Sequence, residues 1–214
     1  MNIKSVINKQ FTGLRNTFIF FQLPAGLILL FVVFLKIAFD VSTGDLLRDA
    51  NAVSHRPPYV GMVSNLGILA WCATACICLF TAFLSHPKGI NVESFLLYSG
   101  ILSAILMFDD LFQFHDEAFP EYLNLSEELV LLSYGLFALI IFYRHKDIIL
   151  STNYLILLTC LALFFISIVV DQFFKEIPAE KLIEDGAKFT GILTWLGYYL
   201  QISYETLKKK ITAA

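Results

Sequence analysis

Charged residues are scarce in this chain, and their scarcity excludes most soluble folds. Only 15% of the 214 residues are Asp, Glu, Lys or Arg, whereas 57% are hydrophobic, including 21 Phe. A soluble domain of ordinary composition carries about 25% charged residues. We therefore expect an integral membrane protein, with the lipid bilayer as its main partner and no nucleic-acid partner.

Cysteine and histidine are equally few, with four of each. All four cysteines lie inside apolar segments, which argues against a disulfide framework or a CxxC redox pair and favours small packing side chains. Only one histidine, His115, lies near the acidic residues, so a three-His zinc site is excluded. The sequence also contains no Glu-x-x-His motif, which excludes a paired di-iron site.

The N-terminal region lacks the features of a cleavable signal peptide. Its basic start, with Lys4, Lys9 and Arg15, leads into an apolar run that is too long for a signal-peptide core. No convincing small-residue cleavage site follows this run. We expect the first span to stay in place as an uncleaved anchor.

Six apolar stretches predict an all-α, polytopic membrane protein built as a compact bundle of six transmembrane helices. They cover residues 17–38, 60–84, 93–114, 129–143, 154–170 and 182–204. The fourth has only 15 charge-free residues, where about 20 are usual, and reaches that length only when extended to 125–145. The chain then divides into an N-terminal cytoplasmic or interfacial segment (1–16), a transmembrane domain (17–206) and a basic cytoplasmic tail (207–214).

The distribution of Lys and Arg predicts that both termini are cytoplasmic. With this orientation nine cationic residues lie in cytoplasmic segments and four in outer loops, as the positive-inside rule requires. Of the 18 acidic residues, only Glu93, Asp147 and Glu205 fall on the inner half. We therefore expect a multi-pass protein of the plasma membrane, or of the inner membrane in a Gram-negative cell, with an acidic outer mouth that attracts cations.

The stretch MFDDLFQFHDEAFPE, residues 107–121, is the most unusual part of the sequence. It begins inside the third apolar run and places Asp109 and Asp110 where one uncompensated carboxylate costs several kcal/mol. The functional interpretation is a metal or cation site, or a proton-handling site. For Asp116 and Glu117 the alternative is a helix end that leaves the membrane into water.

Helical geometry predicts which of these side chains share a face. On a continuous helix Asp109, Gln113 and Asp116 fall on nearly one line, because each residue advances by about 100°. His115 lies more than a quarter turn from that line. It is expected to join the acids only if the helix frays near Pro120 or a neighbouring element approaches.

Three of the predicted spans deliver ionisable side chains to the same outer level. Glu184 and Lys188 in the sixth span are four residues apart, in the order that favours an ion pair. Several carboxylates together are typical ligands of a hard divalent cation. We expect a divalent metal ion of undetermined identity, with ligands drawn from Asp109, Asp110, Asp116, Asp171, Glu184 and Asp185.

Two known families resemble parts of the chain, but neither resemblance places the chain in a family. The membrane hydrolases related to alkaline ceramidases and adiponectin receptors are similar small helical bundles with polar residues at one membrane face. Their zinc site includes a His pair in the last span, which is absent here. The run from Glu184 to Lys188 resembles the Schiff-base lysine segment of microbial rhodopsins, but those have seven spans and a lysine near mid-helix.

The leading hypothesis is a metal-dependent membrane enzyme, a hydrolase or transferase, that acts on a lipid or small amphiphile at the outer face. His115 or Glu117 would move protons, and Lys188 would stabilise developing negative charge. One alternative is a cation or proton channel or transporter that uses the same intramembrane acids. Another is a membrane subunit that docks a cationic partner. The sequence leaves open whether the chain forms a homo-oligomer.

Overall fold

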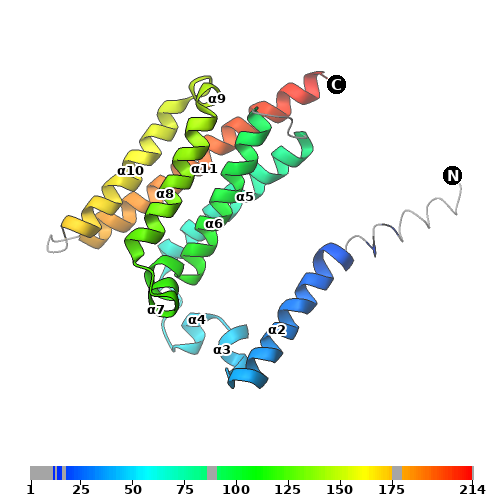
Figure 1. Cartoon of the computed structure of the whole chain (residues 1–214), viewed down its shortest axis with the longest axis vertical. Coiled ribbons are helices and arrows are strands. Elements are labelled where there is room, and N and C mark those ends of the chain that lie inside the picture. Colours follow the sequence, from blue (N-terminus) through cyan, green and yellow to red (C-terminus); the bar gives the residue numbers. More distant parts are fainter. Residues whose placement is uncertain (1–11, 13, 16–17, 86–90, 175–179, 214) are drawn as a thin grey trace, which may run out of the picture. The chain divides into compact units, whose positions relative to one another are not determined.

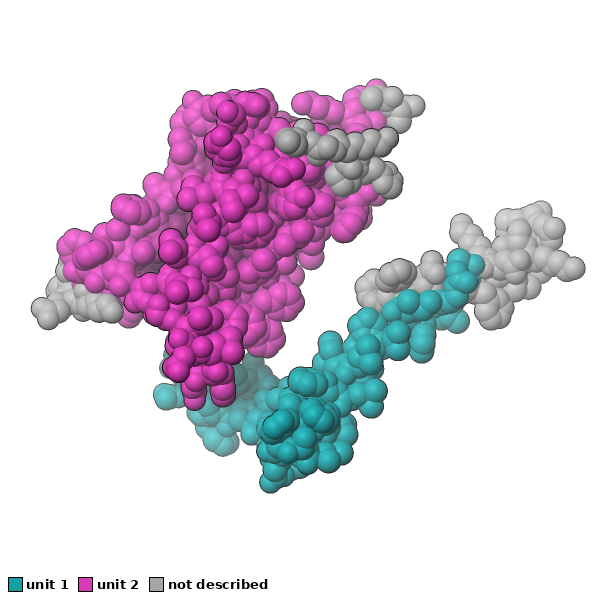
Figure 2. Space-filling model, in the orientation of Figure 1, with its two compact units in different colours: residues 1–60 teal, residues 61–214 magenta. Residues whose placement is uncertain are grey.

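The computed structural model describes residues 12, 14–15, 18–85, 91–174 and 180–213, and every regular element in them is helical. The predicted N-terminal segment 1–16 falls almost entirely outside these residues. The described chain forms two compact units, residues 1–60 and residues 61–214, which Figure 2 draws in teal and magenta.

The first unit contains one long apolar helix and two short polar ones. A π-helical turn, η1 (Phe18–Gln22), leads into α2 (Leu23–Phe39), followed by α3 (Thr43–Leu47) and α4 (Ala50–Val53). Near the end of α2, Lys36 Nζ donates to Asp40 Oδ1 at 2.7 Å. Side-chain oxygens of Ser42 and Asp49 cap α3 and α4 by accepting from the backbone of Gly44 and Ala52.

The second unit is a helical bundle (Figure 1). Its elements are α5 (Met62–Ser85), α6 (Val92–Phe112), η2 (Phe114–Ala118), α7 (Phe119–Leu123), α8 (Glu127–Arg144), α9 (Lys146–Leu150), α10 (Tyr154–Phe173) and α11 (Glu180–Ala213). Within the described residues three helices, α5, α6 and α10, are long and apolar enough to cross a membrane. The all-helical prediction is confirmed.

Helix α11 runs further than the sequence predicts. Its last described residue is Ala213, so residues 207–213, the predicted basic tail, continue the helix. No Gly or Pro interrupts the segment after Gly197. Its lysines are good helix formers, and cations near a helix C-terminus interact favourably with the helix dipole.

The core is built from apolar side chains of α5, α6, α8, α10 and α11. Trp195 and Tyr199 of α11 lie at its centre, with ring centroids 4.9 Å apart. All four cysteines are free, as predicted. Cys78 and Cys160 are fully buried packing residues, whereas Cys76 is exposed on the surface.

Close packing of α10 against α11 requires Gly191, so Gly191→Ala is expected to destabilise the bundle. An added Cβ would lie 2.8 Å from the Phe164 ring, a contact that forces the ring to move. Overpacking of this kind costs about 1–3 kcal/mol, which thermal unfolding in detergent would measure. Gly197→Ala is the matched control because nothing lies within 4 Å of its added Cβ. It should be neutral or slightly stabilising, and equal stability of the two variants would contradict the prediction.

Candidate metal site

A left-handed residue ends α6 and folds the chain back on itself. Gln113 has φ 52° and ψ 45°, and its backbone N–H donates to the Asp109 carbonyl. The prediction that Asp109, Gln113 and Asp116 line one continuous helix is therefore wrong. The break comes seven residues before Pro120, the predicted point of fraying, and it returns His115 towards Asp109.

Asp109 is the anchor of this turn. The residue is only 3% exposed, and its carboxylate accepts from the His115 backbone N–H at 3.0 Å and from the Tyr134 hydroxyl at 2.9 Å. Its second oxygen pairs with Nδ1 of the His115 ring. A carboxylate can only accept, so Nδ1 carries a proton. The cost of burying this acid is thus met by three donors from η2 and α8.

The His115 ring joins Asp109 to Asp116. Nε2 of His115 lies 3.1 Å from Oδ1 of Asp116, whose side chain is half exposed. Burial by itself would lower the pKa of His115, but hydrogen bonds to the two carboxylates outweigh it and raise the pKa to about 10. The same contact with His115 lowers the pKa of Asp116. The ring is therefore an imidazolium at neutral pH.

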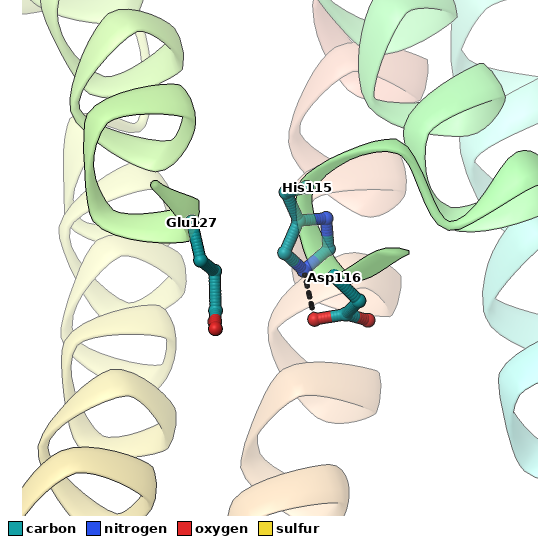
Figure 3. A group of neighbouring side chains, drawn as sticks. All are labelled: His115, Asp116 and Glu127. Atoms are coloured by element: carbon teal, nitrogen blue, oxygen red, sulfur yellow. Dashed lines mark ion pairs between the residues drawn. The ribbon is translucent and has the colours of Figure 1, made fainter. Parts of the chain in front are cut away.

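Glu127, the first residue of α8, completes a group that could hold a metal ion. One ligand atom each from His115, Asp116 and Glu127 lies within 4.8 Å of the others. Figure 3 shows the Glu127 carboxylate reaching down from α8 to the level of the Asp116 carboxylate. The three residues come from two elements, η2 and α8, that the turn at Gln113 and the short helix α7 bring together.

The sequence does not identify Glu127 as a site residue, because neither its spacing nor its neighbours mark it as a ligand. The available signal was topological: the chain reverses between α6 and α8, so the start of α8 lies at the same end of the bundle as the end of α6.

An ion pair from α6 to α11 lies beside this group. Lys188 Nζ donates to Asp110 Oδ1 at 2.9 Å, and Trp71 Nε1 donates to Asp110 Oδ2 at 3.0 Å. Lys188 is also close enough to Asp109 and Asp116 to interact with them electrostatically. The predicted pairing of Lys188 with Glu184 is wrong, because the cross-helix contact with Asp110 holds the ammonium group instead.

The other predicted site residues lie apart from this cluster or have partners of their own. Asp171 accepts from Gln172 at 2.9 Å, and Glu184 accepts from Lys181 at 2.8 Å. Glu117 and Asp185 are exposed. The structure thus brings together five of the predicted residues, and Glu127 adds to them: Asp109, Asp110, His115, Asp116 and Lys188.

Comparison with known proteins gives a family without an assigned activity. A family model described as a domain of unknown function (DUF8692) matches residues 23–202. No curated protein and no solved structure matches the chain significantly.

Proposed function

The chain belongs to the DUF8692 family, and from its own residues we propose that it is a metal-dependent membrane enzyme. In this proposal His115, Asp116 and Glu127 bind one divalent metal ion at the end of a helical bundle. The metal ion supports hydrolysis or group transfer on a lipid or a small amphiphile. The observation that carries the proposal is the geometry of His115, Asp116 and Glu127, with Asp109 behind the imidazole.

The proposed membrane arrangement has six spans, α2, α5, α6, α8, α10 and α11, with both termini in the cytoplasm. Helix α8 has 18 residues, which at 1.5 Å each span about 27 Å, close to the thickness of a bilayer core. The excess of Lys and Arg in the cytoplasmic segments supports this orientation. The metal group then lies at the outer face of the plasma membrane, where lipid headgroups are within reach.

The partners of His115 match those of a metal-binding histidine. Such a histidine usually donates one ring nitrogen to a carboxylate, which fixes the ring and leaves the other nitrogen for the metal. Asp109 takes the Nδ1 side of His115, and Nε2 points at Asp116. A metal ion would replace the Nε2 proton as the positive charge between the ring and Asp116.

The ligand types limit the choice of metal and indicate its chemistry. One imidazole and two carboxylates suit Zn²⁺, Mn²⁺ or Fe²⁺, and three protein ligands leave positions open for water or substrate. A metal ion in such a site activates water or polarises a carbonyl or phosphoryl oxygen. Glu117 is exposed on the same turn and would exchange protons with solvent, while Lys188 would stabilise negative charge near Asp116.

Metal content tests the site directly. Purified protein stripped with a chelator and titrated with Zn²⁺ or Mn²⁺ should bind one ion per chain. Glu127→Gln should weaken this binding by at least the roughly 10–100-fold that loss of an outer-shell partner costs, because it removes the charge of a direct ligand. Glu128→Gln is the matched control, because Glu128 is the adjacent, exposed acid outside the group. Equal metal affinity in the two variants would rule out the site.

Reaction chemistry needs a separate measurement. Stripped and metal-loaded protein would each be incubated with vesicles of a total polar-lipid extract, and the products identified by mass spectrometry. We expect lipid cleavage or transfer only with the metal-loaded protein, and loss of that product in Glu127→Gln. Cation flux through proteoliposomes without any lipid product would instead favour a channel that uses the same acids.

A further inference from the structure

Polar side chains of α6 and α11 face each other along the length of the bundle. Three pairs bridge the two helices: Lys188 Nζ to Asp110 Oδ1 at 2.9 Å, Trp195 Nε1 to Ser103 Oγ at 3.0 Å, and Lys210 Nζ to Glu93 Oε1 at 3.9 Å. The pairs follow in reverse order along the two chains, as antiparallel helices require.

Between the second and third pairs lie buried hydroxyl groups that the protein does not satisfy. Ser99, Tyr199 and Ser203 are at most 2% exposed, and their oxygens have no hydrogen-bond partner among the residues that the structure describes. Ser99 is close enough to Tyr199 for the two hydroxyls to interact, but their geometry is not that of a hydrogen bond. An unsatisfied buried hydroxyl costs about 1–3 kcal/mol.

Of these three residues, Tyr199 is the one whose hydroxyl cannot turn to a carbonyl of its own helix. A helical serine can turn its hydroxyl to the carbonyl four residues earlier, as Ser103 does to Ser99 at 2.8 Å. The phenol oxygen of Tyr199 is too far from its own backbone to do this. Neighbouring Tyr198 shows the ordinary solution, because its hydroxyl lies 2.9 Å from Thr152 Oγ1.

We propose that ordered water bridges Ser99, Tyr199 and Ser203. It lies in the contact between α6 and α11, here called the α6–α11 seam, in the half between Trp195 and Lys210. Three neutral hydroxyls both donate and accept, which suits water and gives no charge to hold an ion. The seam opens at the Glu93–Lys210 pair, where the lysine side chain is 45% exposed. It ends at Trp195, whose indole N–H donates to Ser103 and cannot accept a hydrogen bond from water.

In this proposal the water lies on the Glu93–Lys210 side of Trp195. The Trp195–Ser103 hydrogen bond separates it from the Asp110–Lys188 pair and from the metal group. The bound water does not depend on metal binding, so this proposal stands or falls separately from the proposed enzyme.

The sign of one stability change tests the proposal. If water bonds to the phenol, Tyr199→Phe removes a satisfied hydroxyl and should lower the midpoint of thermal unfolding in detergent. If the seam is dry, the same change removes an unsatisfied group and should raise the midpoint. Tyr204→Phe is the control, because Tyr204 is 63% exposed and should leave the midpoint unchanged. A midpoint that rises or stays constant in Tyr199→Phe would overturn the proposal.

X-ray hydroxyl-radical labelling of the unmodified protein gives a second test that needs no variant. Radicals formed from bound water label the side chains beside it, even when these are buried. We expect Tyr199 to be labelled and Tyr198 to be protected, although both are at most 1% exposed. Protection of Tyr199, or equal labelling of both tyrosines, would show that no water occupies the seam.

Discussion

Asp109→Ala is expected to lower the free energy of unfolding by about 3–5 kcal/mol, the usual cost of breaking a buried ion pair. The substitution leaves the Tyr134 hydroxyl and the His115 backbone N–H without their acceptor, and the imidazolium without its main counter-charge. Asp109 itself is 3% exposed, so these bonds are shielded from bulk solvent. Denaturant unfolding in detergent would measure the change.

The loss of stability should be specific to substitutions of Asp109. Glu117→Gln on the same turn is the control, because its side chain is exposed and no hydrogen bond or ion pair is described for it. Asp109→Asn should fall between the two, because an amide oxygen can still accept one bond but carries no charge for His115. A change below about 1 kcal/mol in Asp109→Ala would show that the turn does not depend on this carboxylate.

Lys188→Met is expected to destabilise the protein by about 2–3 kcal/mol. It leaves the Asp110 carboxylate, which is 11% exposed, with Trp71 as its remaining donor. We place the effect below the usual 3–5 kcal/mol for a buried pair because the lysine side chain is 43% exposed. The matched control is Lys181→Met, whose lysine is 71% exposed beside Glu184 and should change stability by less than about 1 kcal/mol.

A double-mutant cycle would identify the pair as the cause. Asp110→Asn removes the charge that Lys188 neutralises, so the double variant should lose less stability than the two single variants together. The expected coupling is about 1–3 kcal/mol. Simple additivity of the two changes would mean that Lys188 and Asp110 do not stabilise one another.

The paired charges distinguish Asp109 and Asp110 from the acids of the proposed metal site. Asp109 and Asp110 both face cations supplied by the protein, His115 and Lys188, and both carboxylates are largely buried. The half-exposed Asp116 and the partly buried Glu127 lie closer to the end of the bundle. In the proposed site the two more exposed acids, Asp116 and Glu127, are therefore the ones that would bind an external ion.

The sequence by itself determined where the helices form. It also showed that the buried negative charges of Asp109 and Asp110 must be neutralised. Apolar runs set five of the long helices to within a few residues, because burial in lipid or in the core demands continuous backbone hydrogen bonding. Sequence spacing also accounts for the local Lys36–Asp40 contact, since residues four apart along a helix are neighbours whatever surrounds them.

Only the tertiary structure decided which partners compensate the acids. The left-handed turn at Gln113 brings the His115 ring to the Asp109 carboxylate. Helix packing pairs Lys188 with Asp110 instead of with Glu184. Glu127 joined His115 because α7 and α8 fold back beside η2. Such contacts depend on how distant segments pack, and residue type and spacing along one helix carry no information about that packing.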